Sequence, residues 1–97
     1  MVVRKIRWTR RALRRLDEIG AYISAQNPNA ASKVLNRIVV AADSLASQPE
    51  MGRDGRIKGT RELVLPDISY VIAYRVAETS VDILTVVHTS RRWPTFL

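Results

Sequence analysis

The fold of this chain is decided by the stretch Arg61-Glu-Leu-Val-Leu-Pro-Asp-Ile-Ser-Tyr-Val-Ile-Ala-Tyr-Arg-Val76 and by the run that follows it, Val81-Asp-Ile-Leu-Thr-Val-Val-His-Thr-Ser-Arg-Arg-Trp-Pro94. Their β-branched and aromatic residues are typical of strands. We expect strands over 61–65, 70–76 and 81–88, with a turn at Pro66-Asp67 and a hairpin loop over 77–80. The pattern predicts a three-stranded antiparallel meander that ends in a basic and aromatic cluster.

The length of the hairpin loop predicts which side chains share a face of this sheet. With Val76 opposite Val81, one face carries Tyr70, Ile72, Tyr74, Val76, Val81, Ile83, Thr85 and Val87. The other face carries Val71, Ala73, Arg75, Asp82, Leu84 and Val86, with His88 at its edge. Facing opposite charges at Arg75 and Asp82 support this register. We expect helices to cover the first face, whereas the second is too apolar for water and should be an exposed partner surface.

The residues before the sheet predict a short strand and a helical hairpin. Residues 2–8 alternate as a strand does, and Thr9 stands where a helix N-cap would. Apolar residues then recur at spacings of four, three and four from Ala12 to Ile23, which indicates an amphipathic helix. Asn27-Pro28 starts a second helix whose apolar face continues through Leu45. The short link makes the two helices antiparallel, and residues 51–59 are expected to form a glycine-rich, basic loop.

Composition limits the classes of function. The chain has 97 residues, so we expect a single domain over 1–97. Without cysteine, and with one histidine, it offers no disulfide framework and no recognisable metal motif, so we expect no cofactor and no metal. The formal charge of +7 favours an anionic partner. No stretch approaches the roughly 18 apolar residues of a membrane span, and we expect a cytoplasmic protein.

Several motifs occur in an order that resembles the RelE/ParE toxin superfamily, most closely its ParE-like branch. They are Trp8 before the first helix, the Asn27-Pro start of the second, Pro49-Glu-Met-Gly-Arg53, Arg61-Glu-Leu-Val64, Tyr74-Arg-Val76 and His88-Thr-Ser-Arg-Arg-Trp-Pro94. The resemblance covers nearly the whole chain. It implies an α+β toxin of a type II toxin–antitoxin module, neutralised by a co-encoded acidic antitoxin whose partly disordered tail wraps it.

The target differs between the branches. RelE-type members cleave messenger RNA in the ribosome without a metal, whereas ParE-type members inhibit DNA gyrase. Val71 follows Tyr70 where the nucleases carry an arginine, and Glu62 and Val64 correspond roughly to their cationic pair. Only Arg91 matches. The resemblance therefore favours an inhibitory binding protein that acts on gyrase.

Two alternatives stay open. A RelE-like ribonuclease would use His88 as acid or base, with Arg91 or Arg61 on the phosphate. A third class is a non-toxic basic adaptor or repressor subunit. For Trp93 we favour packing of the C-terminus onto the sheet over stacking on a base. The predicted contacts to target or antitoxin are Arg53, Arg56, Lys58, Arg61, Val71, Ala73, Leu84, Val86, His88, Arg91, Arg92 and Trp93.

Overall fold

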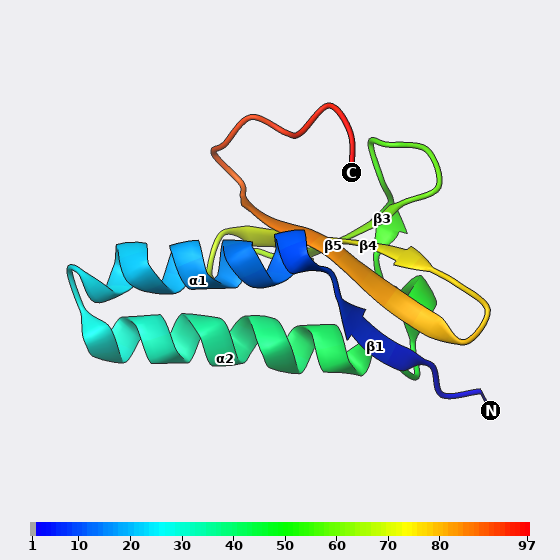
Figure 1. The fold of residues 1–97 in the computed structure, drawn as a ribbon, viewed down its shortest axis with the longest axis horizontal. Coiled ribbons are helices and arrows are strands. Elements are labelled where there is room, and N and C mark those ends of the chain that lie inside the picture. Colours follow the sequence, from blue (N-terminus) through cyan, green and yellow to red (C-terminus); the bar gives the residue numbers. More distant parts are fainter. Residues whose placement is uncertain (1) are drawn as a thin grey trace.

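A computed structural model describes residues 2–97 and shows two helices packed on one face of a five-stranded mixed sheet (Figure 1). In chain order the elements are β1 (Lys5–Trp8), α1 (Arg10–Ser24), α2 (Pro28–Ser44), a 3-10 turn (Pro49–Met51), β2 (Arg53–Asp54), β3 (Arg61–Leu65), β4 (Tyr70–Val76) and β5 (Ser80–His88). The strands lie in the order β1-β5-β4-β3-β2. The predicted α+β class, helical hairpin and meander are confirmed.

Both helices begin at the predicted capping residues. The Thr9 hydroxyl accepts a hydrogen bond from the Ala12 N–H at 3.1 Å, and it donates to the Ile83 carbonyl at 2.8 Å. Asn27 caps α2 by accepting from the Ala30 N–H at 3.2 Å. Each cap satisfies a backbone donor that the helix itself cannot pair. Thr9 therefore also fixes the start of α1 to β5.

The edge strands differ from the sequence-based expectation. β1 starts at Lys5 instead of Val2, and it extends the sheet by pairing parallel to β5. Inside the predicted 51–59 loop, Arg53 and Asp54 form β2 against β3. The expectation of an uninterrupted loop was wrong there, because a strand as short as two residues leaves no alternating pattern to read in the sequence.

A β-bulge overturns part of the predicted hairpin register. Val76 faces Val81 and Arg75 faces Asp82 as expected, but the pairing shifts by one residue between Ala73 and Tyr74, so that Ala73 faces Thr85. Each slip of one residue moves side chains to the opposite face of the sheet. Val86 and His88 therefore lie on the helix-facing side, with His88 opposite Tyr70, and Val87 and Thr85 lie on the second face.

The core lies between the helix pair and the first face of the sheet. Its buried members are Ala12, Ile19, Ile38, Ala41, Ala42, Leu45, Leu65, Tyr70, Ile72, Tyr74, Val81, Ile83 and Val86. Tyr74 is its largest fully buried side chain, and its hydroxyl is paired on both sides. It donates to the Pro49 carbonyl at 2.7 Å and accepts from the Gly52 N–H at 2.9 Å. This pair of bonds joins the turn before β2 to the centre of the sheet.

The second face of the sheet is not open to solvent, which corrects our prediction of an exposed apolar surface. Val71, Ala73 and Leu84 are only 3%, 0% and 9% exposed, and Val86 belongs to the core. After β5 the C-terminal segment turns back toward the start of α1 (Figure 1), where the Phe96 carbonyl accepts from the Arg11 guanidinium at 3.0 Å. The packing of the C-terminus that we favoured for Trp93 and the exposed second face that we also expected exclude one another, and burial of Val71, Ala73 and Leu84 contradicts the exposed face.

Candidate partner-binding site

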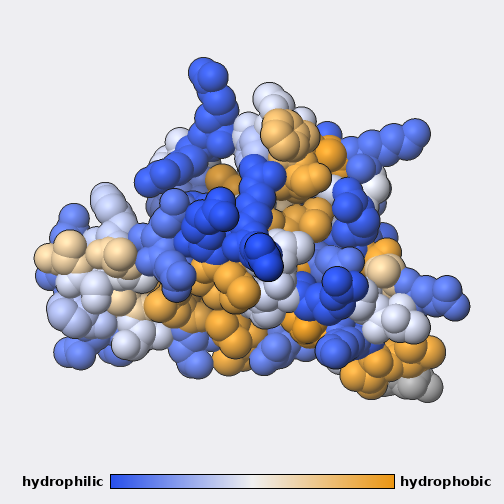
Figure 2. Space-filling model, in the orientation of Figure 1, coloured by the Kyte–Doolittle hydropathy of each residue, from blue (hydrophilic) through white to orange (hydrophobic). Residues whose placement is uncertain are grey.

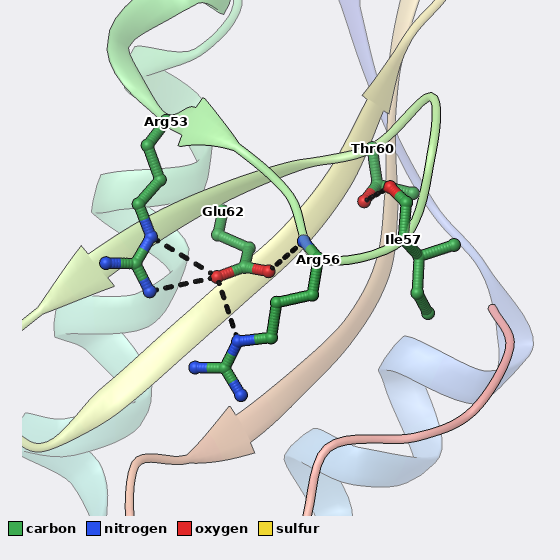
Figure 3. Close-up of polar contacts among 5 residues, drawn as sticks. All are labelled: Arg53, Arg56, Ile57, Thr60 and Glu62. Carbon is green, nitrogen blue, oxygen red and sulfur yellow. Dashed lines mark hydrogen bonds and ion pairs between the residues drawn. The ribbon is translucent and has the colours of Figure 1, made fainter.

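A buried glutamate organises the arginines beside the second face (Figure 3). Glu62 is 1% exposed, and its carboxylate accepts from Arg53 Nη2 at 3.0 Å and from Arg53 Nε at 3.3 Å. The other oxygen accepts from the Arg56 backbone N–H at 2.7 Å, and Arg56 Nε lies 3.7 Å from the first. Because a buried carboxylate requires such partners, Glu62 fixes both arginines and the chain between them.

The loop between β2 and β3 is held by its own hydrogen bonds. The Thr60 hydroxyl donates to the Ile57 carbonyl at 2.6 Å, and the Gly55 N–H donates to the Thr60 carbonyl at 2.8 Å. The Arg61 guanidinium donates to the Gly52 carbonyl at 2.8 Å, so this arginine has a structural bond inside the protein. Lys58 is exposed in the same loop.

A hollow of about 210 Å³ lies where this arginine pair meets the C-terminal segment. The Arg56 guanidinium lies 4.3 Å from the centre of the Trp93 ring, a cation–π contact. The predicted packing of Trp93 against the body of the protein is consistent with its half-buried position. The hollow is lined by Arg53, Arg56, Val64, Val71, His88, Thr89, Arg91 and Trp93.

The geometry of His88 assigns its protons. The Ser90 backbone N–H donates to His88 Nδ1 at 3.1 Å, and the Ser90 hydroxyl is 2.8 Å from the same nitrogen. A backbone N–H can only donate, so the tautomer that fits this bond has its acceptor at Nδ1 and its N–H at Nε2. The ring also stacks edge-on against Tyr70, with 5.1 Å between centroids. The acceptor nitrogen of His88 is therefore already occupied within its own turn.

A larger hollow of about 460 Å³ lies on the opposite side of His88, against α1. Arg15 lines this hollow and donates to Glu18 at 2.8 Å and to the Val86 carbonyl at 3.0 Å. The hydrogen bond from Arg15 lowers the pKa of the Glu18 carboxyl below its usual value, and the charge of Arg91 adds to this effect. The hollow is lined by Arg15, Glu18, Ile19, Tyr22, Tyr70, His88, Ser90 and Arg91.

The structure brings together only part of the predicted contact set. Six of its members line the 210 Å³ hollow: Arg53, Arg56, Val71, His88, Arg91 and Trp93. Lys58 and Arg61 line a different hollow beside Gly59 and Val76. Arg92 lies with Arg11 and Thr85 at a third position.

Sequence reasoning missed two residues that position this site. Glu62 was considered as a non-basic residue in β3 and as a partner of Arg61, whereas it pairs with Arg53 and Arg56, nine and six residues away in the chain. Val64 completes the apolar floor of the hollow. The sequence could not predict this role for Val64, because only the fold of the C-terminal segment brings Trp93 to the same hollow.

The surface in Figure 2 is mainly hydrophilic, with protruding polar side chains and apolar groups over the helix pair and at the C-terminal segment. Exposed large apolar residues include Leu13, Tyr22, Val40 and Phe96. Within residues 2–97, no three His, Cys, Asp or Glu side chains group as metal ligands would. None of the helices in that range is long and apolar enough to cross a bilayer.

Comparisons with known proteins find toxins of the RelE/ParE superfamily. The family described as "ParE toxin of type II toxin-antitoxin system, parDE" matches residues 6–93. "Putative toxin Y4kP" of Sinorhizobium fredii is 58% identical over 97% of this chain and 97% of its own length. "Toxin RelE2" of Caulobacter vibrioides is 42% identical over 87% of this chain and 93% of its own.

Two solved structures are similar throughout. A chain of the chromosomal ParDE toxin–antitoxin system from P. aeruginosa superposes with a TM-score of 0.84 and 25% identity, over 91% of this chain and 98% of that one. A chain of the RelBE2 toxin–antitoxin complex from Mycobacterium tuberculosis gives a TM-score of 0.68 and 27% identity, over 90% of this chain and 99% of that one.

Proposed function

The chain belongs to the ParE toxin family of type II toxin–antitoxin systems, and from that premise we propose that it stops growth by binding and inhibiting DNA gyrase. It would act as an inhibitory binding protein and not as a nuclease. Since gyrase is cytoplasmic, we expect the chain to act in the cytoplasm.

The hydrogen bond at His88 carries this proposal. Metal-independent cleavage of RNA needs a general base to take a proton from the attacking hydroxyl and a general acid to protonate the leaving group. His88 is the chain's only histidine, and its lone pair at Nδ1 already accepts from the Ser90 N–H. A base would first have to give up that bond, so the resting geometry favours binding over proton transfer.

The neighbouring strands also favour a binding role. Val71, at the position where the nucleases resembled in sequence carry an arginine, is 3% exposed. Glu62 brings a negative charge close to the place where a scissile phosphate would lie, and it holds Arg53 at 3.0 Å. A carboxylate there repels phosphate and reduces the pull of the arginines on it.

An acidic antitoxin is the partner that the charge supports. The formal charge of +7 on 97 residues attracts a negatively charged chain, and complementary charge speeds and directs such an encounter. Both similar solved structures come from toxin–antitoxin systems. We propose that a co-encoded antitoxin neutralises this toxin by wrapping it.

A RelE-like ribonuclease is the second candidate, favoured by one observation. Arg53, Arg56 and Arg91 lie around one hollow beside His88, and such a group could hold a phosphate. In that case His88 would transfer the proton, with Arg91 on the scissile phosphate.

Parallel assays of the purified protein distinguish these functions. We expect loss of DNA supercoiling by gyrase and no cleavage of messenger RNA in a translating-ribosome assay. The gyrase effect should survive His88→Gln at least in part, because inhibition by binding needs no proton transfer from this residue. Messenger cleavage that His88→Ala abolishes, with gyrase unaffected, would overturn the proposal.

The antitoxin partnership has its own test. The product of the acidic reading frame beside the gene should co-purify with this chain and restore growth when both are expressed. Tolerance of this chain alone at high expression, with no co-purifying acidic protein, would argue for the third class, a non-toxic basic adaptor or repressor subunit.

A further inference from the structure

Trp93, one of the residues that line the 210 Å³ hollow, carries an unpaired hydrogen-bond donor. Across residues 2–97, the indole N–H of Trp93 is the buried side-chain polar group that lacks a partner. Buried donors without an acceptor are rare in folded proteins, because the group has lost water and gained nothing in return. The nitrogen is almost fully buried, so a ligand in the hollow satisfies it only if the Trp93 ring turns to present the N–H.

The charged residues around the hollow indicate the charge of a ligand that would bind there. Three guanidinium groups surround the hollow, from Arg53, Arg56 and Arg91, and a single carboxylate, Glu62, pairs with the first two. Arg91 is exposed and forms no ion pair with the residues described. Arg91 is therefore the cation that remains to be neutralised, and an anionic acceptor fits it.

The volume and the floor of the hollow indicate the size of the ligand and the polarity of its stem. Its volume of about 210 Å³ is below the roughly 300–1,000 Å³ of ordinary small-molecule pockets. Val64 and Val71 form an apolar floor. One amino-acid side chain with an apolar stem and an anionic tip matches these features, and aspartate and glutamate are the side chains of that kind.

A nucleotide fits less well. Aromatic side chains bind bases through an open ring face, and here the Arg56 guanidinium already lies over the Trp93 ring at 4.3 Å. A base would have to displace that arginine from Trp93 and from Glu62 together. A peptide carboxylate needs no ring face, so it does not compete with Arg56 for the face of Trp93 that Arg56 covers.

From these observations we propose that the hollow receives one acidic side chain of the antitoxin tail, whose carboxylate accepts hydrogen bonds from the Trp93 indole N–H and the Arg91 guanidinium. The inference rests on the proposed antitoxin partnership and adds the site and chemistry of one anchor. Glu62 serves as a positioning residue, because it holds Arg53 and Arg56 at the rim.

Binding of the co-encoded antitoxin to three variants tests the anchor. Trp93→Phe removes the N–H and keeps an aromatic ring, and Arg91→Gln removes the charge. Each should raise the Kd about tenfold or more, the loss expected for a charge-assisted hydrogen bond. Arg75→Gln is the matched control: it removes one exposed arginine charge from β4, opposite Asp82 and outside the residues that line the hollow, and it should change the Kd less than twofold.

The unmodified protein gives a second readout that does not depend on any variant folding. The chain has two tryptophans, so its nitrogen-15 spectrum shows two indole N–H signals, of which Trp93→Phe identifies one. Antitoxin should shift the Trp93 signal downfield and slow its exchange with water, while a short RNA oligonucleotide should leave it unmoved.

These outcomes test the acidic anchor and the antitoxin partnership separately. Normal antitoxin binding by both hollow variants, with an unmoved Trp93 signal, would overturn this inference and leave the antitoxin partnership standing. A Trp93 signal that responds to RNA and not to antitoxin would overturn it in favour of a nucleic-acid site. Failure of any adjacent acidic product to bind would remove the partnership and this inference together.

Discussion

Replacing Glu62 with glutamine should destabilise the protein strongly although the two side chains have the same shape. Both carboxylate oxygens of Glu62 accept hydrogen bonds, one from Arg53 and one from the Arg56 N–H. Glutamine has one acceptor oxygen and one NH₂ group. In either orientation of the amide, its NH₂ group must face one of these donors.

The expected loss of stability follows from the burial of the Glu62 side chain. A buried donor left without an acceptor costs about 1–3 kcal/mol, and a hydrogen bond to a charged group contributes about 1.5–3 kcal/mol. The side chains of Arg53 and Arg56 are 57% and 55% exposed, so water can rehydrate their charges and the ionic contribution to the loss is smaller. We expect a loss of about 2–4 kcal/mol for Glu62→Gln, which lowers the Tm of a domain of this size by roughly 10–25 °C.

Thermal unfolding followed by circular dichroism measures this effect. Glu78→Gln is the control, because it removes the same charge from an exposed loop position and should stay within about 0.5 kcal/mol of the parent. If Glu62→Gln had the same Tm as the control, the buried carboxylate would not be what fixes the arginine pair.

Four further results are expected. Tyr74→Phe should cost about 2–3 kcal/mol in urea unfolding, because it leaves the Pro49 carbonyl and the Gly52 N–H unpaired in the interior. Burial raises the pKa of the Tyr74 hydroxyl above its usual 10.0, so the unfolded chain ionises first and stability falls as pH rises above about 10; Tyr74→Phe should lose less stability in that range than the parent, and an equal loss would contradict this. Gly52→Ala should be at least as damaging as Tyr74→Phe, since an added Cβ would lie 2.5 Å from the Tyr74 hydroxyl; melting near the parent temperature would refute that contact. The hydrogen bond from Arg37 lowers the pKa of the Asp67 carboxyl, so Arg37→Gln should return that pKa toward 3.8 in an NMR titration, and an unchanged value would count against the pair.

The helices and the central strands could be predicted because their signals are local. Thr9 and Asn27 bind backbone donors three residues away in their own chain, so the residue type at one position is enough to mark each helix start. The apolar spacing from Ala12 to Ile23 likewise reports one face of one helix. Family resemblance rested on the same kind of information, namely short motifs in a fixed order.

The faces of the hairpin could not be predicted in full, because a β-bulge is a property of two paired strands. One extra residue at Leu84 leaves the register correct from Val76 to Tyr74 and reverses it beyond that point. This single slip moved His88 from the predicted partner surface to the side of Tyr70 and α1. Nothing in the alternation of 81–88 shows where the extra residue lies.

The sequence by itself determined the fold class, the family and the excess of positive charge, since each depends on residue types and their order. Only the tertiary structure decided which charges are free to bind a partner. Arg53 and Arg56 are paired with Glu62, whose interaction with the arginines depends on β2 joining the sheet, whereas Arg91 has no ionic partner among the described residues. Tertiary contacts also brought Trp93 under Arg56. Such contacts join residues far apart in the chain, and their energies depend on burial, which no local pattern encodes.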